Sequence, residues 1–134
     1  MRFMILIKGS EADADMPPEQ QSEMFEEMGK FNEALAKDGV LLAMEGLRPS
    51  SKGKRIRFEG GRTTVTDGPF TESKELIAGF WIVNCKSHEE VVERFKHVPF
   101  GDGSVLEIRE VGEPEDFGEE LAADIREHRK HVGV

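Results

Sequence analysis

The apolar positions of this chain fall into short continuous runs and into segments with helical spacing. Residues 3–7 are apolar at every position, which predicts a central strand covered on both faces. Between residues 19 and 37 the apolar positions recur every three or four residues, as on one face of a helix, and Gly39 provides the stop. These positions are Met24, Met28, Phe31 and Leu35. Residues 40–44 are again apolar and predict a second strand.

Turn and capping residues divide the rest of the chain into further elements. Gly60-Gly61 is a pair that a two-residue hairpin turn favours, and alternating residues flank it on both sides. Ser87 and Glu90 have the spacing of a capping box, which predicts the start of a second helix. The remaining predicted elements are a hairpin over 54–59 and 62–66, a strand over 77–85, a helix after 87, and a strand over 104–111.

The order of these elements predicts an α+β fold. Without the hairpin insertion it is β-α-β-β-α-β, the ferredoxin-like arrangement, in which two helices cover one face of an antiparallel sheet. The strands are apolar on both sides, so the uncovered face predicts a partner, and two such sheets packed face to face would make a homodimer. We assign residues 1–111 to this domain. Residues 112–134 are an acidic tail, expected to form a short helix docked on the body or on a second subunit.

Charge and composition limit the classes of partner and the cellular compartment that we expect. The chain has 134 residues and a net charge of −9, so we expect one domain and neither nucleic acid nor an anionic membrane as a partner. No apolar run is long enough for a membrane span. The single cysteine, Cys85, follows an apolar strand and is expected to be a buried, inert thiol in a reducing cytosol. We therefore expect a cytoplasmic protein.

The segment 66–75 combines a turn with a dense set of charges next to predicted core. Asp67 is expected to accept backbone hydrogen bonds within the turn, Gly68 to supply a positive φ, and Phe70 to plug the core. Glu72 and Lys74 would follow in one polar helical turn. A rigid charged corner suits a ligand site, but a capped turn with a solvated surface is the commoner role of such residues, because an Asp that caps a turn is common.

Other candidates for chemistry lie elsewhere in the chain. Glu45 follows a buried strand, where partial burial raises the pKa of a carboxyl group, or it is simply an exposed strand end. Trp81 is expected in the core or in a pocket wall. His97 falls in the last turn of the second helix, where the helix dipole favours a cation, although a pocket base is the alternative. His128 and His131 lack a third ligand nearby, so no metal is expected.

The chain resembles the YCII-related domain family. Residues 65–75, VTDGPFTESKE, carry the DGPF signature of that family, and Gly79-Phe80, Glu45-Gly46-Leu47, residues 105–109 and the acidic tail match the same pattern. The resemblance implies a dimeric α/β barrel built from ferredoxin-like subunits. It also implies a setting near extracytoplasmic-function sigma factors, and distant relatives that include lyases, isomerases and a dehydrochlorinase. The histidine that better-studied members carry on the first helix is missing from residues 19–37, so their His–Asp dyad is not carried over.

Three hypotheses about function follow. The first is acid–base chemistry of the lyase or isomerase type on a small organic acid, with Asp67 and Glu45 as the catalytic carboxylates and Arg48 or Lys74 holding the anion. The second is a non-catalytic sensor or accessory protein in a stress or regulatory setting, and the third is a purely structural dimer. No phosphate-loop or dinucleotide motif is present, so we expect no cofactor. The substrate-binding positions expected near the corner are Arg48, Phe70, Glu72, Lys74, Trp81 and His97.

Overall fold

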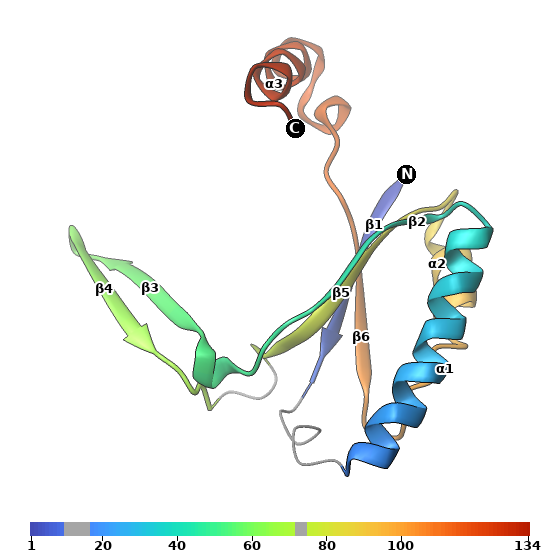
Figure 1. Ribbon diagram of the computed structural model, residues 1–134. Helices are drawn as coiled ribbons and strands as arrows, with labels where there is room; N and C mark the ends of the chain where they lie inside the picture. Colours follow the sequence, from blue (N-terminus) through green and yellow to red (C-terminus); the bar gives the residue numbers. More distant parts are fainter. Residues whose placement is uncertain (10–16, 72–74) are drawn as a thin grey trace.

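The computed structural model describes residues 1–9, 17–71 and 75–134, and its elements follow the predicted order (Figure 1). The elements are β1 (Arg2–Lys8), α1 (Pro18–Lys37), β2 (Leu41–Gly46), η2 (Ser50–Lys52), β3 (Lys54–Glu59), β4 (Arg62–Asp67), β5 (Ile77–Asn84), α2 (His88–Phe95), β6 (Val105–Glu110), η4 (Pro114–Phe117) and α3 (Glu119–Val132). The short helices η2 and η4 are 3₁₀ turns. The predicted α+β fold of ferredoxin-like type with a hairpin insertion is confirmed.

The body of the molecule is a four-stranded antiparallel sheet with the strand order β2-β5-β1-β6. β1 is an inner strand, and its Ile5 lies opposite Trp81 of β5 and Ile108 of β6. Figure 1 shows α1 and α2 together on one face of this sheet. Within the described residues no helix covers the other face, which is the face expected to meet a partner.

The core lies between the sheet and the two helices. Its largest fully buried side chains are Phe3, Ile5, Val83 and Val91. Trp81 is 3% exposed, packs edge-on to Phe95 of α2, and donates its indole N–H to the Asn32 side-chain oxygen of α1 at 2.8 Å. Cys85 is buried as predicted, and burial raises the pKa of its thiol. A buried thiol with a raised pKa is a poor nucleophile.

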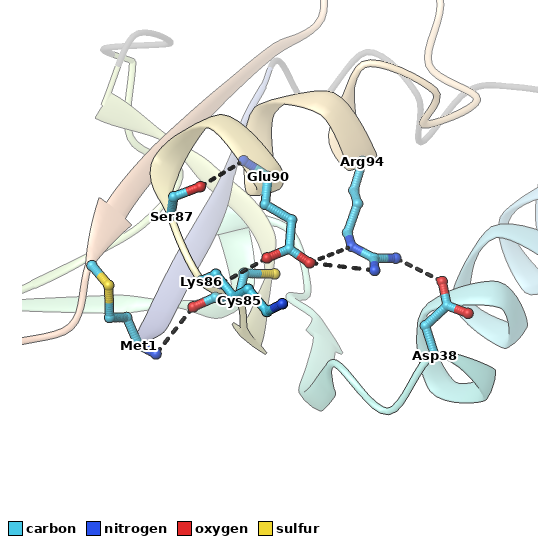
Figure 2. Close-up of polar contacts among 7 residues, drawn as sticks. All are labelled: Met1, Asp38, Cys85, Lys86, Ser87, Glu90 and Arg94. Carbon is cyan, nitrogen blue, oxygen red and sulfur yellow. Dashed lines mark hydrogen bonds and ion pairs between the residues drawn. The ribbon is translucent and has the colours of Figure 1, made fainter.

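Polar contacts fix α2 against the end of α1 (Figure 2). The Ser87 hydroxyl accepts from the Glu90 N–H at 3.2 Å, as the capping box predicts. The Glu90 carboxylate accepts from the Lys86 N–H at 2.7 Å, which is one residue before the helix cap, and this bond holds the pKa of Glu90 below its usual value. Arg94 lies between Glu90 at 3.4 Å and Asp38 at 2.8 Å, so one guanidinium joins the two helices.

Two parts of the chain project from the body, away from α1 and α2 (Figure 1). The first is the hairpin β3–β4, whose turn residues Gly60 and Gly61 have φ of 57° and 76°, as the predicted two-residue turn requires. The second is the tail, in which α3 packs chiefly on η4 and buries Pro114 and Ala122. The predicted tail helix is therefore present, and its main contact is with the short turn just before it.

Candidate functional site

A cavity of about 630 Å³ lies between α1 and the β2 side of the sheet. One wall is α1, and the other is formed by β2 and β5 with Phe100 from the loop that follows α2. The lining residues are Ile7, Phe25, Met28, Gly29, Asn32, Glu33, Ala36, Leu41, Met44, Glu45, Gly46, Phe80, Trp81 and Phe100. The cavity is therefore built around the same tryptophan that anchors α1 to the sheet.

The lining is mainly apolar and aromatic. Phe25 is 83% exposed although it belongs to the lining, and Trp81 at 3% exposed forms an inner wall. Gly29 adds volume, because a Cβ atom at this position would have nothing within 4 Å. Glycine in a helix interior costs about 1 kcal/mol relative to alanine, so an open wall is obtained here at the expense of helix stability.

The polar groups of the lining are Asn32, Glu33 and Glu45. The Asn32 side-chain oxygen is used by the Trp81 N–H, which leaves its amide N–H donors to face other partners. Glu33 of α1 and Glu45 of β2 are exposed, and the register that pairs Glu45 with Phe80 places the Glu45 carboxylate at the rim, toward the sheet face without helices. Because none of the lining residues is a lysine, arginine or histidine, the charge of this cavity is negative.

Two of the residues that the sequence indicated, Glu45 and Trp81, belong to this lining. Arg48 and His97 are exposed and lie outside the lining. α2 ends at Phe95, so His97 follows the helix and does not lie in its last turn as expected. Glu72 and Lys74 fall outside the described residues, and the structure is silent on the roles predicted for them.

Asp67 ends β4, with a side chain 74% exposed, and its carboxylate pairs with the Lys54 ammonium of β3 at 2.5 Å. It is not part of the cavity lining, so the structure does not bring Asp67 and Glu45 together in one pocket of a single chain. The expectation that Asp67 caps its own turn also fails at the positions described. Pro69 has no N–H, and the N–H groups of Gly68 and Phe70 go to the Gly53 carbonyl and the Ser50 hydroxyl.

The corner is held against η2 at the base of the hairpin. Gly68 is required there by contact and not by its φ, which is not positive, because a Cβ would lie 1.7 Å from the Ser50 carbonyl oxygen. Phe70 is half-buried, with the Arg55 guanidinium 3.9 Å from its ring centroid. It is not part of the main core, so the expectation that it plugs that core is wrong.

The residues that sequence reasoning missed are those of α1. Phe25, Gly29, Asn32 and Glu33 all face the cavity, although only the core-facing positions of this helix stood out by their spacing. The available signal was Gly29, a glycine in the middle of an otherwise strong helix-forming segment.

Among the residues described, no group of three or more His, Cys, Asp or Glu could hold a metal ion. No helix of the described part is long and apolar enough to cross a membrane.

Comparison with known proteins matches most of the chain to one protein family. The model of the YCII-related domain matches residues 1–114. An uncharacterised protein of Rhizobium meliloti (strain 1021) is 28% identical over 75 residues, which are 56% of this chain and 60% of that protein's length. The chain thus matches less than two-thirds of the length of this curated relative.

A solved structure also aligns with the chain. It is the 5-chloro-2-hydroxyhydroquinone dehydrochlorinase of Burkholderia phenoliruptrix AC1100 in complex with 2,5-dihydroxybenzoquinone. The alignment covers 84% of this chain and 96% of the dehydrochlorinase chain, at 15% identity and a TM-score of 0.42.

Proposed function

The chain belongs to the YCII-related domain family, and on that premise we propose that it binds a small organic molecule in the cavity between α1 and β2. The observation that carries this proposal is the cavity itself. Its volume of about 630 Å³ lies within the usual range of ligand pockets, roughly 300–1,000 Å³. Its walls are mainly apolar with a few polar groups, which is also the usual composition of such sites.

The lining indicates the kind of ligand. Phe25, Trp81 and Phe100 offer ring faces and edges to a flat or cyclic apolar body. Glu45 and Glu33 accept hydrogen bonds from hydroxyl or amine groups and repel a carboxylate. The predicted anion-holding residues do not supply a counter-charge, since Arg48 is outside the lining and Lys74 outside the described residues. The ligand proposed is therefore a cyclic compound with hydrogen-bond donors and no strong negative charge.

Within this proposal Glu45 carries any acid–base step. It is the one predicted catalytic carboxylate in the lining, and a general base must lie within hydrogen-bond reach of the proton that it removes. Asp67 remains a predicted catalytic residue that lies outside this cavity. The separation of the two carboxylates favours a second candidate function, a sensor or accessory protein that binds the same ligand without turnover.

The proposed assembly is a homodimer that joins the uncovered faces of two sheets. β1 and β5 alternate buried residues on the helix side with half-buried Met4, Leu6, Phe80 and Ile82 between them. Apolar side chains on a sheet face without helices are typical of an interface. A second copy offers the same face in return, as the closed two-fold symmetry of most homodimers requires.

The binding proposal is tested by the fluorescence of Trp81, the only tryptophan, which lines the cavity. A panel of cyclic phenols, amines and acids is titrated into the protein, and we expect saturable changes with the neutral or donor-rich compounds and none with the acids. Glu45→Gln should weaken binding of the compounds that respond, whereas Asp67→Asn should leave it unchanged. A panel without any saturable change, or binding confined to the acids, would refute the proposal.

Catalysis is tested separately on the compounds that bind. If the Glu45→Gln protein still binds these compounds with lower affinity but forms no product, the acid–base hypothesis is supported. If the parent protein binds these compounds and forms no product from any of them, the non-catalytic hypothesis is supported. Product formation that is unchanged in Glu45→Gln would remove Glu45 from the chemistry.

A further inference from the structure

The hairpin β3–β4 exposes an apolar face that nothing in the described chain covers. The register pairs Ile56 with Val65, and strand alternation places Phe58 on the same side. These three side chains are 59%, 59% and 78% exposed, in the order Ile56, Val65 and Phe58. An isolated two-stranded hairpin is marginally stable in water. The hairpin therefore needs a cover for this face.

The tail presents a second uncovered apolar surface. Phe117, Leu121 and Val132 are 56%, 49% and 52% exposed, and α3 rests chiefly on η4. Leu121 and Val132 belong to α3 with Ile125 between them, and these spacings of four and seven residues place the three side chains along one side of the helix, whereas Phe117 ends η4 just before it. An amphipathic helix with such a stripe is suited to lie across an apolar sheet face.

The two surfaces are complementary in charge. Residues 54–67 contain four basic and two acidic side chains, a net charge of +2. Residues 113–134 contain seven acidic and three basic side chains, a net charge of −4 with neutral histidines. In the described part of the chain, Arg57 and Arg62 of the hairpin have no ion-pair partner, nor do Glu119, Glu120, Asp124 and Glu127 of the tail. The hairpin and the tail therefore carry opposite net charges, which favours the approach of one segment to the other.

The hairpin and the tail of one chain lie far apart, at opposite ends of the sheet (Figure 1). The hairpin leaves from the end of β2, and the tail leaves from the end of β6. A two-fold axis that reverses the strand direction brings the hairpin end of one copy beside the tail end of the other, and it does so twice. A second copy can therefore cover the apolar face of the hairpin and the apolar side of the tail at the same time.

We propose that two copies of this chain clasp each other, with α3 of each copy lying on the Ile56–Phe58–Val65 face of the hairpin of the other. The clasp rests on the face-to-face pairing of two sheets proposed above and adds a second contact that flanks it. Arg57 and Arg62 point to the other face of the hairpin, the one that carries Thr64, so the electrostatic attraction acts between the net charges of hairpin and tail and not through an ion pair on the apolar face.

The clasp is tested by cross-linking chains that carry single new cysteines. Phe58→Cys protein is mixed with Leu121→Cys protein and treated with a short bis-maleimide, with the parent protein as a control because its Cys85 is buried. We expect a covalent dimer containing one chain of each kind. The matched pair Thr64→Cys and Ala123→Cys, which lie on the other faces of the hairpin and helix, should cross-link far less.

Sedimentation of Phe58→Asp and Leu121→Asp gives a second measure. We expect either change to weaken dimerisation by roughly tenfold or more, since each replaces a large apolar side chain that is buried twice in a symmetric dimer. A stable dimer without the specific cross-link overturns the clasp and leaves the sheet pairing intact. A monomer at all concentrations overturns both.

Discussion

Replacing Gly29 should separate helix stability from ligand binding, because this residue serves the cavity at a cost to α1. Glycine in a helix interior is about 1 kcal/mol less favourable than alanine, chiefly through the backbone entropy lost on folding. Gly29 lies in the middle of α1, its φ is not positive, and an added Cβ meets nothing within 4 Å. Neither steric overlap nor backbone strain therefore opposes a larger residue.

Gly29→Ala should stabilise the protein by about 0.5–1 kcal/mol and raise its midpoint of thermal unfolding by roughly 2–4 °C. Gly29→Leu should retain most of this gain, since leucine is also a strong helix former. Its side chain, however, projects into the cavity of about 630 Å³ and competes with any ligand that touches this wall.

The assay combines urea unfolding with the Trp81 fluorescence titration on all variants. Gly29→Ala is the matched control for the size of the side chain, and Lys30→Leu controls for an added apolar residue on α1 outside the lining. We expect ligand affinity to fall at least tenfold in Gly29→Leu and to change little in the two controls. A destabilised Gly29→Ala would refute the account of the helix, and unchanged affinity in Gly29→Leu would show that the ligand does not use this cavity.

Two further predictions concern the corner and the Arg2–Glu113 ion pair. Gly68→Ala should destabilise the protein by about 2 kcal/mol or more, since its Cβ would overlap a backbone carbonyl, whereas Gly101→Ala, whose Cβ meets nothing within 4 Å, should be nearly neutral in urea unfolding. The hydrogen bond from Arg2 holds the pKa of Glu113 below its usual value, so this pair contributes stability above about pH 5 that is lost as the pH falls through the lowered pKa. The contribution should be at most about 1 kcal/mol because both side chains are about one-third exposed, and Glu113→Gln should remove it from the pH dependence of unfolding.

Local signals predicted the fold well. The hairpin turn could be placed from Gly60-Gly61 alone, because two adjacent residues at positive φ are nearly always glycine or asparagine. The start of α2 could be placed from Ser87 and Glu90 for a similar reason, since the capping bonds connect residues three apart. In both cases the interaction that fixes the structure lies within a few residues of sequence.

The candidate site was harder to predict because its contacts join distant segments. Glu45 and Trp81 were named from their own surroundings, but nothing local indicated that α1 would supply the facing wall of the cavity. The corner was interpreted as a self-contained turn, whereas its Gly68 and Phe70 are fixed by Ser50 of η2. Ser50 is eighteen residues from Gly68 and twenty from Phe70, so no spacing pattern within the turn itself could indicate this contact.

The inner position of β1 has a consequence for synthesis of the chain. Its apolar stretch is synthesised before both of its neighbours, since β5 and β6 begin only at Ile77 and Val105. The nascent chain must therefore keep residues 3–7 unpaired until β5 has been translated, and exposed apolar segments are prone to aggregate during such a delay. Translation that pauses between α1 and β5 should favour aggregation, whereas a pause after β6 should not.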